Sequence, residues 1–91
     1  MGKILIVDDA KFMRMTLTKI IEQAGHEVVG EAMTGTEAIE QFRRLKPDLV
    51  FMDITMPDMD GIQAVRTIMN EFPDAKIVMC SAMGQQDMVV D

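Results

Sequence analysis

The sequence has little of what several common classes of protein require. Its 91 residues include a single cysteine, Cys80, so no disulfide can form within the chain, which favours a cytoplasmic location. No apolar run approaches the roughly 18 residues of a membrane span. The amino terminus does not have the architecture of a signal peptide. We therefore expect a cytoplasmic protein without a membrane segment.

Basic residues and histidine are also scarce. Nine Lys and Arg against 15 Asp and Glu give a net charge of −6, which argues against nucleic-acid binding and favours a bound cation or a basic partner. One cysteine and one histidine, His26, do not make a zinc site or a Ser–His–Asp triad. There is no Gly-x-Gly-x-x-Gly motif and no P-loop, so flavin or dinucleotide binding is disfavoured.

What the sequence does contain is a regular alternation of strand-like and helix-like segments. A hydrophobic fraction of 48% and this length indicate one small folded domain, residues 1–91. The spacing predicts strands at 3–8, 27–31, 49–53 and 76–80, and helices at 11–24, 34–46, 62–72 and from 85 to the end. Alternation with short loops predicts a parallel sheet with helices on both faces.

The first three predicted helices carry specific signals, and so does one strand. The first has apolar residues at helical spacing (Met13, Leu17, Ile20, Ile21, Ala24) and is predicted to end at Gly25 in a left-handed cap. The second starts with Thr34-Gly35-Thr36-Glu37, the form of a capping box. The third is predicted to turn Ile62, Val65, Ile68, Met69 and Phe72 inward. The run Leu49–Met52 predicts a strand buried on both faces.

Polar side chains stand where three of the predicted strands end: Asp8 and Asp9, then Asp53, then Ser81. If these strands are neighbours, the groups converge on one edge of the sheet, where ligands of parallel sheets bind. Grouped carboxylates repel unless a cation lies among them, and oxygen ligands favour magnesium, calcium or manganese. Asp53 could then act as a nucleophile towards phosphorus. The alternative is that Asp8–Asp9 and Ser81 are ordinary turn and helix-cap residues.

Three segments in this order resemble the receiver domain of bacterial two-component response regulators. They are Ile-Val-Asp8-Asp9, then Val-Phe-Met-Asp53-Ile-Thr-Met-Pro57 with Gly61, then Val-Met-Cys-Ser81-Ala82. Residues 10–14 and 80–86 further resemble the chemotaxis type. The resemblance implies a flavodoxin-like, doubly wound α/β fold with strand order 2-1-3-4 for the four βα units present.

The resemblance also implies a function and a set of site residues. Asp53 is expected to be the phosphoacceptor, receiving a phosphoryl group from a histidine kinase, and the chain is not expected to be an enzyme. Mg²⁺ is expected to bind the carboxylates of Asp9 and Asp53, the backbone carbonyl of Thr55 and, mainly through water, Asp8. Ser81 is expected to be the switch hydroxyl that reads the phosphoryl group. The output partner is expected to be the flagellar motor or another protein.

The family pattern continues into a fifth strand with a lysine and an aromatic residue, and into a fifth helix, whereas this sequence ends at Asp91. We therefore expect a C-terminally truncated receiver domain, with the edge of the fourth strand and an apolar surface left open. The alternative is a folding or assembly fragment that forms a homodimer through this surface and does not signal. An aspartate-nucleophile phosphatase is disfavoured, because Thr55 stands where such enzymes need a second acid.

Overall fold

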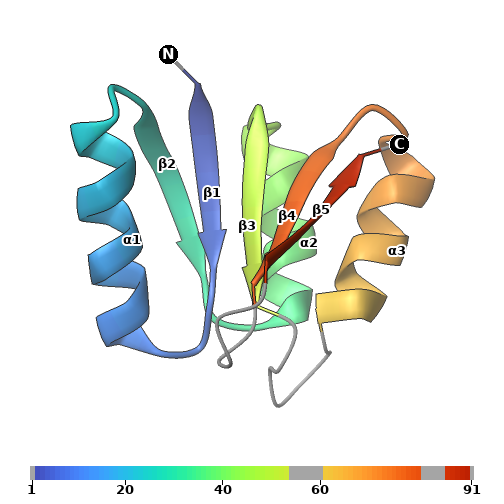
Figure 1. Ribbon diagram of the computed structural model, residues 1–91. Coiled ribbons are helices and arrows are strands. Elements are labelled where there is room, and N and C mark those ends of the chain that lie inside the picture. Colours follow the sequence, from blue (N-terminus) through green and yellow to red (C-terminus); the bar gives the residue numbers. More distant parts are fainter. Residues whose placement is uncertain (1, 54–60, 81–85, 91) are drawn as a thin grey trace.

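The computed structural model describes residues 2–53, 61–80 and 86–90. These residues form a five-stranded sheet of order β2-β1-β3-β4-β5, with helices on both faces (Figure 1). The strands are β1 (Lys3–Val7), β2 (Glu27–Ala32), β3 (Leu49–Asp53), β4 (Lys76–Cys80) and β5 (Gln86–Val90). The helices are α1 (Lys11–Gln23), α2 (Gly35–Leu45) and α3 (Gly61–Glu71).

The first four strands are parallel and confirm the predicted order 2-1-3-4. Strand β1 lies between β2 and β3, so that Val7 is level with Ala32 on one side and with Met52 on the other. At the far side of β3, Asp53 is level with Cys80 of β4. The carboxyl ends of the parallel strands therefore meet at one edge of the sheet, as the sequence predicts.

The prediction of a fourth helix from residue 85 is wrong. Residues 86–90 instead form β5, which pairs antiparallel with β4, Ile77 being level with Val89. Two physical reasons favour the strand: Val89 and Val90 are β-branched, and the outer edge of β4 offers backbone groups that need partners. The expectation that the β4 edge stands open, with no fifth strand present, is therefore also wrong.

The face of the sheet under α2 and α3 carries the main core. Every second residue of β1 and β3 points to it, and Leu5, Val50 and Met52 are fully enclosed there. The rings of Phe42 in α2 and of Phe72, the residue after α3, pack with their centroids 5.0 Å apart. This face is a continuous core in which α2 and α3 also pack against each other.

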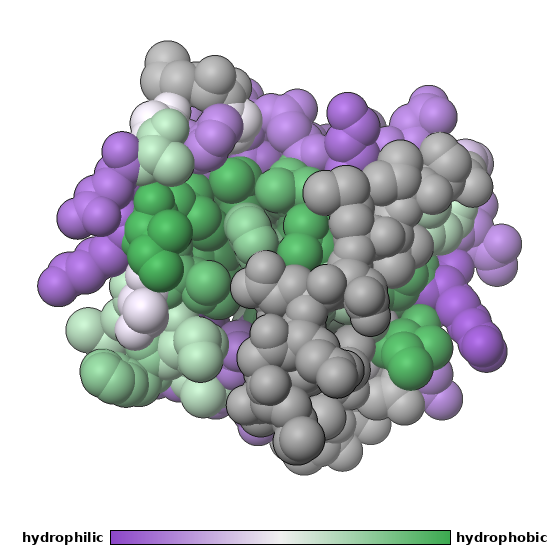
Figure 2. All heavy atoms as spheres, viewed as in Figure 1, coloured by the Kyte–Doolittle hydropathy of each residue, from purple (hydrophilic) through white to green (hydrophobic). Residues whose placement is uncertain are grey.

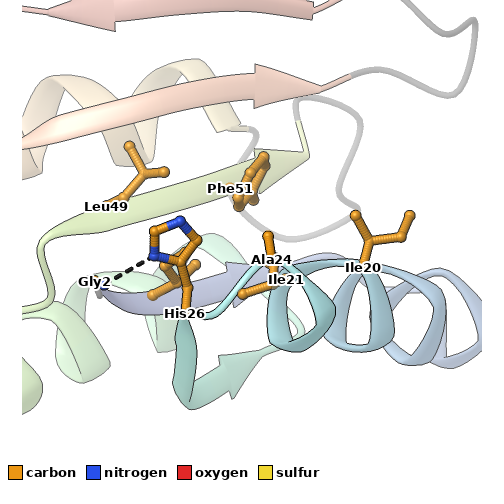
Figure 3. Close-up of a pocket in the computed structure, with 8 residues that line it drawn as sticks. Gly2, Ile20, Ile21, Ala24, His26, Leu49 and Phe51 are labelled. Carbon is orange, nitrogen blue, oxygen red and sulfur yellow. Dashed lines mark hydrogen bonds between the residues drawn. The ribbon is translucent and has the colours of Figure 1, made fainter.

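The opposite face is covered by α1, which packs against β1 and β2. Its buried residues are Ile4, Ile6 and Ile21. Helix α1 does not extend over β3. Leu49 and Phe51 of β3 are half-buried there, beside an apolar cavity of about 300 Å³ (Figure 3). Hydrophobic residues gather on this side of the molecule (Figure 2). The prediction that Leu49–Met52 is buried on both faces is thus wrong for one of the two faces.

Some predicted inward residues are exposed on helices of both faces. On α1, Met13 and Ile20 are 46% and 58% exposed, and on α3 Ile62 is 50% exposed. A helix that packs through one side buries only a stripe of its surface, so the flanking apolar positions stay in solvent. The sequence therefore predicted more inward residues on these helices than the structure buries.

The predicted cap at Thr34 and the predicted left-handed Gly25 are confirmed. The Thr34 hydroxyl accepts a hydrogen bond from the Glu37 amide, as in a capping box, and the Glu37 carboxylate accepts one from the amide of Met33, the residue before the cap. Gly25 follows α1 with φ of 90°, the left-handed conformation that favours glycine. Among the described helices, none has the length and apolar character needed to cross a membrane.

Candidate functional site

Three carboxylates converge at the carboxyl edge of the sheet. Asp8 directly follows β1, Asp9 comes next, and Asp53 is the last residue of the neighbouring strand β3. One carboxylate oxygen from each of the three lies within 4.8 Å of the other two. Neighbouring parallel strands in this register bring together the acids that the sequence placed at the strand ends.

Asp8 is held by bonds at both its backbone and its side chain. Its amide donates to the Ala32 carbonyl at 3.0 Å, which extends the pairing of β1 with β2 by one residue. Its Oδ1 accepts a bond of 2.8 Å from the amide of Ala10, the residue that precedes α1. The alternative interpretation of Asp8 as a turn residue is therefore confirmed. It is compatible with metal binding, because a carboxylate has acceptor capacity for more than one partner.

The electrostatic environment of Asp8 disfavours its charge. Burial raises the pKa of this carboxyl, the amide of Ala10 opposes that rise, and repulsion from Asp53 and then Asp9 adds to it. The charge of Arg14 acts in the opposite direction but is the smallest of these influences. Asp8 is thus a carboxyl whose ionised form needs a further positive charge nearby.

The donor set fits a hard divalent cation. Asp8 and Asp53 are 9% and 7% exposed, whereas Asp9 is open to solvent. Two ionised carboxylates this close repel each other, and the repulsion grows as the surroundings become less polar. A cation among the three oxygens removes that cost, and carboxylate oxygens are the ligands that Mg²⁺ and Ca²⁺ prefer. Water can reach the group from the side of Asp9.

Sequence reasoning missed one residue beside this group. Arg14 of α1 is 8% exposed, and its Nη1 donates to the Asp8 carbonyl at 2.6 Å. Its Nε donates to Glu31 of β2 at 2.8 Å, in a salt bridge. A signal was present in the sequence, since Arg14 stands three and seven residues before Leu17 and Ile21, on the inward stripe of the helix. A charged residue in that stripe indicates a buried partner.

Two other predicted site residues, Thr55 and Ser81, lie outside the described residues, as does Pro57. Gly61, which belongs to the second of the three segments that resemble a receiver domain, is the first residue of α3 and is buried. The structure therefore brings together the three predicted acids. The roles of Thr55 and Ser81 stay predictions.

A five-stranded sheet with three acids at the carboxyl edge defines the class of a receiver domain. The family model described as "Response regulator receiver domain" matches residues 4–91. The chain belongs to this family, whose members act as phosphoacceptors in two-component signalling.

Within this family the chain is similar to the chemotaxis protein CheY. It is 62% identical to CheY of Thermotoga maritima over 92 residues, covering 100% of this chain and 77% of that protein. It is 55% identical to CheY of Listeria monocytogenes, covering 100% of this chain and 76% of that protein. The chain thus spans about three quarters of the length of these relatives.

A solved structure shows the same fold. The chain is similar to the crystal structure of the CheX–CheY–BeF₃–Mg complex from Borrelia burgdorferi, with a TM-score of 0.87 and 38% sequence identity. The match covers 91% of this chain and 63% of that one. The fold prediction is confirmed by this likeness together with the strand order. The dimerising-fragment alternative is not favoured, because β5 occupies the β4 edge that motivated it.

Proposed function

We propose that this chain is the phosphoacceptor of a chemotaxis-type phosphorelay and that Asp53 receives the phosphoryl group. The observation that carries the proposal is the convergence of Asp8, Asp9 and Asp53 within 4.8 Å at the end of β3. Family membership and the similarity to CheY support the same role. The donor would be a phosphohistidine of a kinase, and the output partner would be a flagellar motor protein or another signalling protein.

The transfer step follows from the placement of Asp53. An oxygen of its carboxylate forms a bond to phosphorus while the bond between phosphorus and the histidine nitrogen breaks, and that nitrogen keeps the electron pair. With the donor ring protonated on its other nitrogen, the products are an acyl phosphate on Asp53 and a neutral imidazole on the donor. Because Asp53 is nearly buried at the tip of a strand, its carboxylate is held in position before the donor arrives.

Mg²⁺ is the cation that we propose for this site. The carboxylates of Asp9 and Asp53 and the Thr55 carbonyl would hold it, with Asp8 acting mainly through water. When bound, it would neutralise the charge of the transferring phosphoryl group. The similar complex from Borrelia burgdorferi supports this choice, since it contains CheY together with Mg²⁺ and BeF₃. Ser81 is proposed as the hydroxyl that donates a hydrogen bond to the new phosphoryl oxygens.

The proposal is tested by adduct formation. The protein is incubated with acetyl phosphate and MgCl₂, and the mass of one added phosphoryl group is sought by intact-mass spectrometry. Mass detection suits this chain because it contains neither Trp nor Tyr, so intrinsic fluorescence is weak. We expect one adduct, lost when EDTA replaces MgCl₂ and lost in Asp53→Asn.

The matched control is Asp74→Asn, which removes an exposed acid between α3 and β4, at the opposite edge of the sheet. This variant should form the adduct like the parent chain. An adduct that persists in Asp53→Asn, or its absence from the parent chain in MgCl₂, would contradict the proposed function.

A further inference from the structure

Arg14 is a buried cation in a helix whose other buried residue is Ile21. Its exposed fraction is 8%, and it precedes Leu17 and Ile21 on the stripe that packs against β1 and β2. Burying a guanidinium costs free energy unless hydrogen bonds and an opposite charge compensate it. An apolar side chain would serve packing alone, so the bonds that Arg14 makes indicate its role.

Those bonds connect three elements at the edge of the acid site. From α1, the Arg14 guanidinium donates to the Asp8 carbonyl after β1 at 2.6 Å, and to the Glu31 carboxylate of β2 at 2.8 Å. Because a guanidinium is planar and its donors diverge at fixed angles, the two bonds hold each other in place. Glu31 is half exposed, so it can anchor Arg14 while remaining partly solvated.

The Asp8 carbonyl belongs to the peptide that links Asp8 to Asp9. The amide of Asp8 is already bonded to Ala32, and its side chain to Ala10. The bond from Arg14 adds a third constraint, on the peptide from which the Asp9 carboxylate extends. Both carboxylates lie within 4.8 Å of Asp53, a placement that their mutual repulsion opposes.

From this geometry we infer that Arg14 is a positioning residue of the metal site: by holding the Asp8–Asp9 peptide it keeps both acids in place for Mg²⁺. This inference rests on the proposed function. It predicts that Arg14 acts on metal affinity through position and not through charge. The two effects have opposite signs, since removing a nearby positive charge should by itself strengthen cation binding.

The test is the Mg²⁺ dissociation constant of the full chain at neutral pH, measured by isothermal titration calorimetry well below the unfolding temperature. We expect Arg14→Gln to weaken binding by about 10–100-fold, as loss of a residue that orients metal ligands typically does. Arg14→Lys should recover part of the affinity, because an ammonium can reach the carbonyl but cannot make both bonds.

The matched control is Arg43→Gln. It breaks the exposed salt bridge between Arg43 of α2 and Glu71 of α3. This contact is also an Arg–Glu pair, but it lies away from the three acids. Its Mg²⁺ affinity should equal that of the parent chain. Unchanged or tighter binding in a folded Arg14→Gln variant would overturn the inference. A lower unfolding temperature with unchanged affinity would show that Arg14 serves only the packing of α1.

A second pair of variants covers the case in which Arg14→Gln does not fold. Glu31→Gln removes the anchor of Arg14, and Glu27→Gln makes the same charge change at the other end of β2, on an exposed residue. We expect weaker Mg²⁺ binding in Glu31→Gln than in Glu27→Gln, and equal affinities would overturn the inference. If the parent chain itself does not bind Mg²⁺, the proposed function fails instead, which is a separate result.

Discussion

The two faces of the sheet differ in how completely helices cover them. Among the described residues, the face under α2 and α3 has a core of 13 buried hydrophobic residues, whereas the face under α1 has three. Strands supply six of the 13 and two of the three, since the residues of β1 and β3 point alternately to the two sides. Helices α2 and α3 add six residues on the first face, and α1 adds one on the other. The difference therefore arises from the helices above each face and not from the composition of the strands.

Strand β3 shows this most directly. Val50 and Met52 are fully buried under α2 and α3, and Leu49 and Phe51 are half-buried beside the cavity on the other side. All four are large apolar residues, so their sequence alone does not distinguish the faces. One helix that packs on β1 and β2 is too narrow to reach across β3. We therefore expect stability to depend mainly on the α2–α3 face.

The largest expected effect is that of Phe42→Ala on the well-covered face. Phe42 is 3% exposed and packs on Phe72, so truncation leaves a cavity that its neighbours cannot fill. We expect a loss of about 3–5 kcal/mol in the free energy of unfolding. Urea titration followed by circular dichroism measures it. A loss below about 1.5 kcal/mol, within the range of volume-conserving core changes, would contradict this view of the core.

Phe51→Ala is the same change on the other face. Because Phe51 is half-buried, less apolar surface returns to water, and we expect a loss of about 1–2 kcal/mol in the free energy of unfolding. The same urea titration applies. Equal losses in Phe51→Ala and Phe42→Ala would mean that the α1 face is as well covered in solution as the other, and the comparison would fail.

The helices of the two faces also differ at their first residues. Thr34 caps α2 through its hydroxyl, whereas Ala10 precedes α1 without a side-chain cap. Thr34→Ala should therefore cost about 1 kcal/mol of stability, and Ala10→Ser should raise stability by a smaller amount, up to about 1 kcal/mol. Thermal melts of both variants check this. A loss in Ala10→Ser would show that the bond from its amide to Asp8 already satisfies the start of α1.

The smallest expected effect is electrostatic. It concerns Asp8, which lies at the carboxyl ends of the strands, between the two faces of the sheet. Since the pKa of Asp8 is raised on folding, the folded state binds more protons than the unfolded state between the ordinary and the raised pKa. Ionised Asp8 thus lowers stability as pH rises through that interval. Without metal, Asp8→Asn should raise the unfolding temperature by a few degrees at neutral pH, on the scale of roughly 4–8 °C per kcal/mol for a small domain.

The gain in Asp8→Asn should shrink as the pH falls towards about 4, near the ordinary pKa of an aspartate. Asp74→Asn, at an exposed site, serves as the control and should show no comparable pH dependence. A gain that stays constant between pH 4 and 7 would indicate that the change acts on packing or hydrogen bonding and not on charge.

Much of the site could be predicted because the acids stand at strand ends. In the sequence, Asp8, Asp9 and Asp53 stand at the ends of apolar runs. Parallel pairing then places the carboxyl ends of the strands together on one side of the sheet. Arg14 was not predicted, because its role depends on the crossing of α1 over β1 and β2, which brings its guanidinium to a backbone carbonyl. The residue pattern marks Arg14 as a charge in the inward stripe of α1, but the partner that it binds is set by tertiary packing.

By itself, the sequence determined the local elements and their order. Apolar periodicity, the capping box at Thr34 and the left-handed Gly25 are properties of short segments, and the structure confirms each. The tertiary structure decided the state of residues 86–90. Val89 and Val90 favour a strand, but it is the outer edge of β4 that supplies the hydrogen-bond partners for one. The tertiary structure also decided which apolar residues are buried, since burial depends on what covers a face and not on the residue alone.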